Sequence, residues 1–195
     1  MKKIYKRMLI VLIGIIAIVL LVVIVNKIHY EYTMRKYKKA GQQQYEMVKE
    51  YFYENESLLK GICDELLKID EFEYGNYTIQ FEEDGGGGNY FTESDIICYL
   101  NGEFHSWNDE IEENLNNNTV LKEYFDECIK SEKLSYIVID NGYYSTITFQ
   151  PNPELIPLVL PNFSPSNEVI YCENSGYTQR SIEENWYIRI GGVLE

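Results

Sequence analysis

An uninterrupted apolar run near the N-terminus most constrains how this chain can fold. Residues 8–25 read MLIVLIGIIAIVLLVVIV, with one glycine, no charge and no proline. In a helix, at about 1.5 Å per residue, such a run spans roughly 27 Å, close to the hydrocarbon thickness of a bilayer. A buried helix of a globular core rarely lacks a polar position over this length. We therefore expect a transmembrane anchor within residues 1–26.

The residues on either side of the run indicate an uncleaved anchor and its orientation. The run ends in Val-Ile-Val-Asn-Lys-Ile-His, which has no small residue of the kind that signal peptidase needs. Four bases precede the run: Lys2, Lys3, Lys6 and Arg7. Only Lys27 lies among the first nine residues after it. The positive-inside rule then predicts a single-pass protein of the cell membrane, with a cytoplasmic N-terminus and residues 42–195 outside the cell.

Charge is divided unevenly along the chain. Residues 1–40 hold nine Lys or Arg and one acid, a net +8, whereas residues 41–195 hold eight Lys or Arg and thirty acids, a net −22. The basic, tyrosine-containing residues 27–41 predict a juxtamembrane helical stalk. A domain at −22 repels nucleic acid and anionic lipid, so any charged partner of the domain is expected to be basic.

Residues 42–195 have the pattern of an α+β domain. Apolar residues recur every three or four positions in 42–69 and 119–131, which predicts two main amphipathic helices packed on an antiparallel sheet of about six strands. Ser106 is expected to cap a short acidic helix that runs to residue 115, and Thr119 to cap the helix 119–131.

The strands are indicated by alternation and turn residues. Residues 77–82 and 96–100 are expected to pair through a long hairpin loop, and 134–139 and 143–149 through an Asn141-Gly142 turn. Residues 168–172 and 185–190 are the last expected strands. In the latter, the spacing places Trp186, Ile188 and Ile190 on one face.

The first of these loops contains four consecutive glycines, Gly85–Gly88, among acidic residues. Asp84, Asn89, Glu93 and Asp95 carry oxygen ligands suited to calcium, but the alternating ligand positions of an EF-hand are absent. A phosphate loop needs Gly-Lys-Ser or Gly-Lys-Thr, and no lysine is near. We favour a flexible loop, and we expect no metal and no cofactor.

The four cysteines and two histidines of the chain do not form a recognisable metal-binding or catalytic motif. Cys63, Cys98, Cys128 and Cys172 are 35, 30 and 44 residues apart, which matches no metal motif. Their apolar neighbours favour buried thiols, while three disulfide pairings stay open for an exported domain. No Gly-x-Ser-x-Gly, His-Glu-x-x-His or Cys-x-x-Cys occurs, so we expect no enzyme, although a carboxylate pair of the glycosidase type has no motif to exclude it.

All five prolines lie between residues 151 and 165, around the apolar residues 155–160. A proline-broken segment is not a central strand, so it either covers a sheet edge or presents an apolar patch to a partner. Leu158 and Phe163 are the candidate partner-binding residues in this segment.

One N-terminal anchor, a basic stalk and an acidic α+β domain, together with Glu173-Asn-Ser-Gly-Tyr177 and Glu184-Asn-Trp-Tyr187, resemble the TipC-type membrane-anchored immunity proteins of Gram-positive bacteria. The resemblance is architectural and assigns no site residue. It implies an extracytoplasmic binding protein that neutralises an exported toxin. The alternative is a structural or sensory cell-envelope protein without a toxin partner.

Overall fold

A computed structural model describes residues 2–70, 72, 75–81, 95–141, 145–159, 167–172 and 180–190 of the 195-residue chain. The chain divides into two compact units, Met1–Ala40 and Gly41–Val193. The first helix, α1 (Lys2–Glu54), contributes residues to both units.

The part of α1 in the first unit carries the apolar run. From Leu12 to Val25 the large apolar side chains are 50–66% exposed, so no protein surface buries them. Mean hydropathy reaches 2.6, and by length and composition the helix is able to cross a membrane. This finding is compatible with a single-pass anchor, and a signal sequence near the N-terminus would meet the same criteria.

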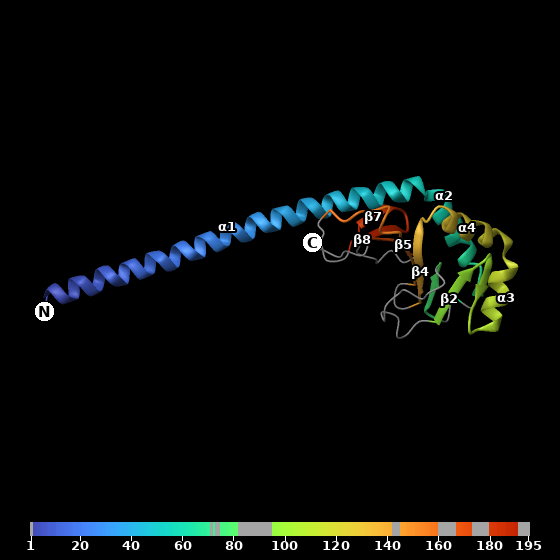
Figure 1. Ribbon diagram of the computed structural model, residues 1–195, viewed down its shortest axis with the longest axis horizontal. Helices are drawn as coiled ribbons and strands as arrows, with labels where there is room; N and C mark the ends of the chain where they lie inside the picture. Colours follow the sequence, from blue (N-terminus) through green and yellow to red (C-terminus); the bar gives the residue numbers. More distant parts are fainter. Residues whose placement is uncertain are drawn as a thin grey trace. The chain divides into compact units, whose positions relative to one another are not determined.

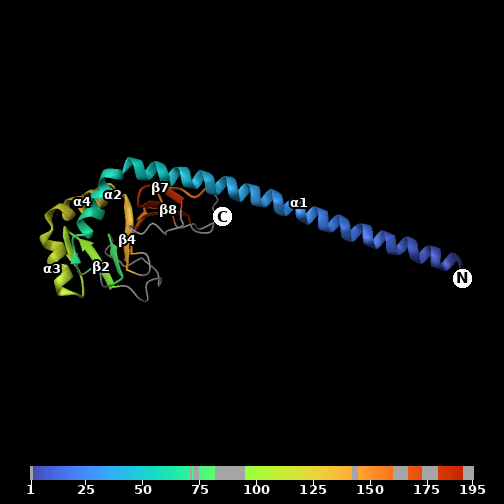
Figure 2. The ribbon, with the colours of Figure 1, turned by 180° about the vertical axis from the view of Figure 1, so that it is seen from behind.

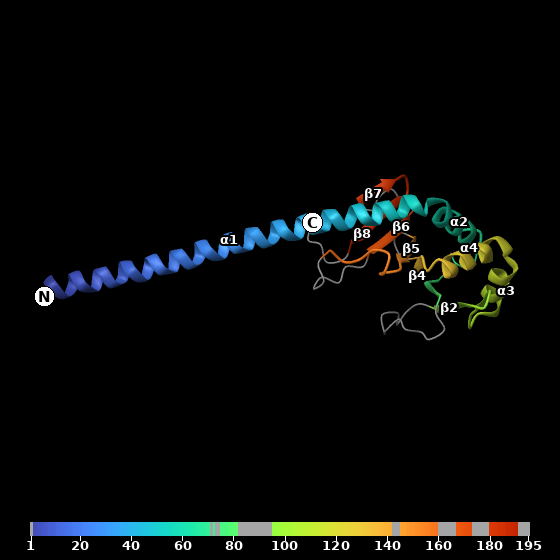
Figure 3. The same cartoon turned by 45° about the horizontal axis from the view of Figure 1, so that its top comes forward.

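The second unit is an α+β domain with one sheet. After α1 come α2 (Glu56–Leu66), α3 (Asp109–Asn117) and α4 (Thr119–Lys130). The strands are β1 (Tyr77–Gln80), β2 (Asp95–Leu100), β3 (Glu103–His105), β4 (Leu134–Asp140), β5 (Thr146–Pro151), β6 (Asn167–Cys172), β7 (Arg180–Glu183) and β8 (Trp186–Ile190). They form a mixed eight-stranded sheet in the order β3-β2-β1-β4-β5-β6-β8-β7, which Figure 3 shows from β2 across to β7. In Figures 1 and 2, α2, α3 and α4 gather on one side of the sheet.

The expected hairpin between residues 77–82 and 96–100 is wrong, because β1 and β2 are parallel. β2 makes its antiparallel pair with β3 instead, across a turn in which Asn101 and Gly102 have φ of 52° and 83°. Two positive φ angles are typical of a tight hairpin turn. The other edge of β1 pairs antiparallel with β4, so the sheet is mixed, and two strands beyond the expected six, β3 and β7, extend its ends. Alternation marks a strand but carries no information on its direction.

The core lies between the sheet and the helices. One row of cross-strand neighbours runs over six strands, and its members are at most 2% exposed: Ile97, Ile79, Ile137, Phe149, Val169 and Ile188. The antiparallel pairs β4–β5 and β6–β8 confirm the strands expected there. The expected turn at Asn141-Gly142 is not tested, because Gly142 lies outside the described residues, and Asp140 pairs with Thr146, so β5 starts at Thr146 and not at residue 143. Trp186 and Ile188 are buried, and Ile190 packs beside them against the core, as their spacing predicts.

The expected helix 42–69 is in fact two helices, because α1 ends at Glu54 and α2 starts at Glu56. Asn55 leaves helical geometry at ψ 13°, and its side-chain Nδ2 donates to the Tyr51 carbonyl at 2.9 Å. Asparagine competes for backbone hydrogen bonds in this way, which interrupts helices. Because the apolar stripe continues across the break, the periodicity of the sequence does not reveal that the helix ends at Glu54.

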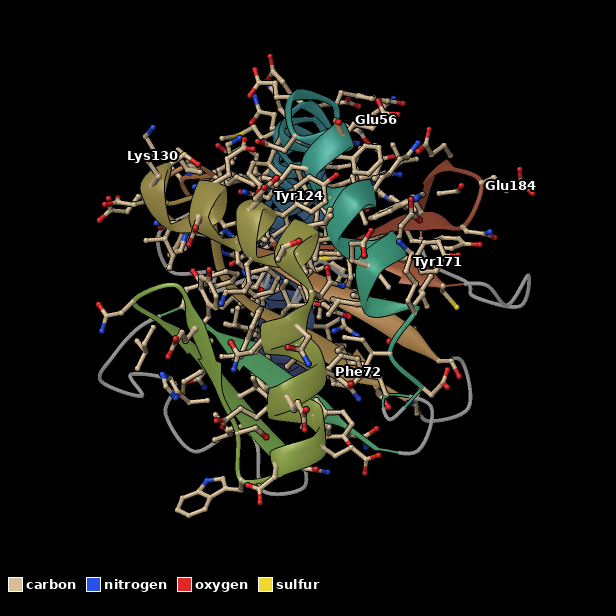
Figure 4. All side chains as sticks on the ribbon, turned by 90° about the vertical axis from the view of Figure 1, so that its right-hand side faces the viewer. Glu56, Phe72, Tyr124, Lys130, Tyr171 and Glu184 are labelled. Carbon is tan, nitrogen blue, oxygen red and sulfur yellow. The ribbon has the colours of Figure 1, made fainter. Side chains whose placement is uncertain are left out.

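The helix at 119–131 is confirmed as α4, with Leu121, Phe125 and Cys128 buried. Ile129, expected in the same stripe, is instead 41% exposed. Tyr124 lies between α4 and α2 (Figure 4), and a Cβ at Gly61 of α2 would overlap its ring. Glycine is therefore what permits this close helix packing.

Both expected helix caps are displaced by asparagines. Asn108, not Ser106, caps α3, since its Oδ1 accepts from the backbone N–H of Glu110 at 3.1 Å. Asn118, not Thr119, caps α4 in the same way. The four cysteines are present as thiols; Cys63, Cys128 and Cys172 are buried, as their sequence context predicts, whereas Cys98 is half-buried.

Candidate partner-binding cleft

Two clefts of about 500 Å³ each lie among the described residues of the second unit. One, lined mainly by apolar side chains, includes Phe72 and Tyr171, which Figure 4 labels. The other includes the proline-rich segment in which the sequence predicts a partner-binding site. We call the second one the α1 cleft; its lining residues are Met47, Glu50, Tyr51, Glu54, Asn55, Ser131, Lys133, Leu155 and Ile156.

One wall of the α1 cleft is a single face of α1. Met47, Glu50, Tyr51 and Glu54 are three or four residues apart, so they line up on one side of the helix. Tyr51 is 5% exposed, and its hydroxyl donates to the carbonyl of Lys133 at 2.9 Å. Burial, with a smaller contribution from Cys128, raises the pKa of Tyr51 far above its usual range. Tyr51 is therefore a neutral donor that holds α1 against the start of β4.

The opposite wall is the described part of the proline segment, residues 152–159. Its start is held where the backbone N–H of Asn152 donates to the Lys133 carbonyl at 3.0 Å. Its end is held where the N–H of Val159 donates to Oε1 of the buried Gln44 at 3.0 Å. Between them, Ile156 is 2% exposed and belongs to the core. The segment is thus fixed at both ends and in the middle.

This placement corrects the expectation that the segment covers a sheet edge. The edge strands are β3 and β7, and the described part of the segment packs instead on α1 through Gln44. The reason is that Ile156 reaches the core on the helix-covered side of the sheet. The neighbouring side chains are consequently left on the surface.

Two leucines of the segment are exposed at the cleft or next to it. Leu158, predicted from the sequence, is 38% exposed and follows Pro157, whose carbonyl faces Gln44 Nε2 at 3.5 Å. Leu155, which the sequence argument missed, is 48% exposed and lines the cleft itself. Its only signal in the sequence is membership of the same apolar run. Phe163 lies outside the described residues.

The rim of the α1 cleft is acidic. Glu50 and Glu54 are exposed on the α1 wall. Among the described lining residues the one base is Lys133, whose Nζ pairs with Oε1 of Glu127 at 2.8 Å, so its charge is compensated. Sequence reasoning missed both glutamates, because they are about a hundred residues from the leucines that they accompany.

An acidic rim around exposed leucines suits the binding of a cationic surface that carries an apolar group. Among the described residues, no group of three or more His, Cys, Asp or Glu side chains is arranged to hold a metal ion. The glycine loop with Asp84, Asn89 and Glu93 lies outside the described residues, as does Glu173-Asn-Ser-Gly-Tyr177. Glu184 and Asn185 form the turn between β7 and β8, with Asn185 at φ 65°.

No protein-family model, curated protein or solved structure matches this chain.

Proposed function

We propose that this chain is a membrane-anchored extracytoplasmic binding protein, and that its acidic domain neutralises an exported, basic protein toxin. In this proposal α1 holds the chain in the cell membrane with the N-terminus in the cytoplasm. The toxin docks at the α1 cleft, and the protein acts by binding, without catalysis. This is the role of the TipC-type immunity proteins that the chain resembles in plan.

The observation that carries the proposal is the α1 cleft itself. It combines the exposed side chain of Leu155 with two carboxylates on a wall that hydrogen bonds hold in place, and the exposed Leu158 belongs to the same segment as Leu155. A preformed wall lowers the entropy lost on binding, and exposed apolar groups supply lasting affinity. The net charge of −22 over residues 41–195 steers a basic partner toward the domain.

The test looks for a gene for a large secreted toxin beside this one, and then asks whether expression of the chain protects cells from that toxin. Reversing the rim charge with Glu50→Lys and Glu54→Lys should abolish protection and slow association at least roughly tenfold. The matched control, Glu110→Lys with Glu113→Lys, makes the same change of charge on exposed positions of α3 and should leave protection intact.

Kinetics separate the electrostatic and apolar contributions. Association should slow as NaCl rises from about 50 to 500 mM, with dissociation changing less. Leu155→Ser with Leu158→Ser should instead speed dissociation, by roughly tenfold or more. An association rate indifferent to salt would refute the electrostatic part of the proposal.

The second candidate is a structural or sensory cell-envelope protein, which the anchor and domain alone would serve. It predicts no protection by expression of the chain and no effect of the α1-cleft variants on survival. Failure of the wild-type chain to protect would place this candidate ahead.

A further inference from the structure

A basic segment follows the apolar run within α1. Residues 27–39 hold five bases against a single acid, Glu31, and belong to the first unit. All five bases are exposed: Lys27, Arg35, Lys36, Lys38 and Lys39. Four of the five bases lie within residues 35–39, in a chain whose net charge is −14.

Helical geometry places most of these bases on one side. At about 100° per residue, Lys27, Arg35, Lys38 and Lys39 fall within an arc of about 120°. The same turns of the helix expose apolar and aromatic groups, with Ile28 at 63%, Tyr30 at 64% and Tyr32 at 69%. Tyrosines beside bases are typical of the boundary between hydrocarbon and water.

Distances along the helix place the segment within reach of lipid headgroups. Measured from Val25, Tyr30 lies about 7.5 Å and Arg35 about 15 Å along the axis. The headgroup layer is roughly 5–7 Å deep on each side, and Lys and Arg side chains extend back toward it. The Debye length at physiological salt, about 8 Å, then keeps the bases in the field of an anionic surface.

We propose that residues 27–39 bind anionic phospholipid headgroups, so that the chain selects anionic lipid at the point where α1 leaves the membrane. Charge complementarity decides the occupant, because clustered bases next to a lipid-embedded helix attract phosphate while zwitterionic lipid offers no net charge. The inference uses the membrane anchor of the proposed function and is independent of a toxin partner.

The experiment reconstitutes the full chain in phosphatidylcholine vesicles that contain phosphatidylglycerol, and measures the lipids that remain bound by native mass spectrometry. Phosphatidylglycerol should be enriched over its share of the vesicle, and the enrichment should fall as NaCl rises. Arg35→Gln, Lys38→Gln and Lys39→Gln together should weaken phosphatidylglycerol binding at least about tenfold. The control makes the same change of charge in the second unit, with Lys49→Gln, Lys122→Gln and Lys130→Gln, and should retain the enrichment.

Three results would overturn the inference. One is enrichment that survives the triple change in residues 35–39. Another is equal loss in the control, which would show a response to total charge alone. The third is a loss of phosphatidylglycerol enrichment only when Lys2, Lys3 and Lys6 are changed to Gln, which would show that the lipid binds at the N-terminal side of the apolar run. Soluble glycerol phosphate in excess should not displace the bound lipid; displacement would identify a site for free phosphate. Toxin protection is read separately, so its failure leaves this measurement unaffected.

Discussion

At the scale of single residues, Phe125 is a core side chain whose substitution should lower the free energy of unfolding. It is fully buried on α4, with its ring centroid 5.0 Å from Phe81, 5.3 Å from Tyr99 and 4.9 Å from Phe104. Aromatic rings at these separations pack in tilted and edge-on arrangements that add to the free energy of burial. The cluster ties α4 to β1, β2 and β3.

Phe125→Asp should therefore lower the free energy of unfolding by about 4 kcal/mol or more, because it removes a buried ring and leaves an unpaired carboxylate in its place. Ile129→Asp is the matched control on the same helix, where the side chain is 41% exposed, and should cost about 1 kcal/mol or less. Urea denaturation of the detergent-solubilised chain measures both. Similar losses for the two variants would contradict the assignment of Phe125 to the core.

The buried acidic hydroxyls and thiol make stability depend on pH. Burial raises the pKa of Cys128 from 9.0 to about 12, while nearby Lys133 lowers it slightly. Burial, and then the hydrogen bond from the Tyr99 hydroxyl to Asp126 at 2.6 Å, raises the pKa of Tyr99. Tyr51 is shifted in the same direction. In each case the folded pKa lies above that of the unfolded chain.

Such groups contribute stability that is fully present below the unfolded pKa and is lost as pH rises toward the folded pKa. We expect the melting temperature to be unaffected by them up to about pH 8.5 and to fall from about pH 9 to 12. Tyr99→Phe should make this decline shallower, since phenylalanine has no proton to lose. Thermal melts of both proteins across this range provide the measurement, and parallel declines would contradict the role of Tyr99.

At the scale of elements, the start of α4 joins two helices through one side chain. Asn118 Oδ1 accepts from the backbone N–H of Leu121 at 2.9 Å, which caps α4, and its Nδ2 donates to Glu65 of α2 at 3.0 Å. Lys68 and then Asn118 hold the pKa of the Glu65 carboxyl below its ordinary value. Asn118 thus caps the N-terminus of α4 and also connects α4 to α2.

Asn118→Ala should lower the free energy of unfolding by about 1–2 kcal/mol, because the cap and the contact between helices are lost together. Asn117→Ala, at the adjacent exposed position, should change it by less than about 0.5 kcal/mol. Chemical denaturation of the two variants gives the comparison. A loss at Asn117 as large as that at Asn118 would show that general helix propensity, and not the cap, is responsible.

At the scale of the whole molecule, the positive-inside rule predicts the side of the membrane on which the second unit lies. The bases Lys2, Lys3, Lys6 and Arg7 predict a cytoplasmic N-terminus, and the long domain after the apolar run is then translocated. Protease added to intact, wall-stripped cells should therefore remove the acidic domain. Survival of the domain until the cells are lysed would reverse the orientation and exclude an exported partner.

The sequence by itself determined the apolar helix, the α+β class, the strands β4 and β5 and the amphipathic helix α4, because each depends on local periodicity. The parallel pairing of β1 with β2, the break at Asn55 and the edge strands β3 and β7 were decided by tertiary structure. Strand direction depends on which edges remain open after other pairs form, and the stripe of an amphipathic helix continues unchanged across a kink. The residues of the candidate binding site were likewise predictable from the sequence only in part. The proline-broken run predicted one exposed leucine, Leu158, whereas Leu155, Glu50 and Glu54 line one cleft only because Ile156 enters the core and brings distant residues of the chain together.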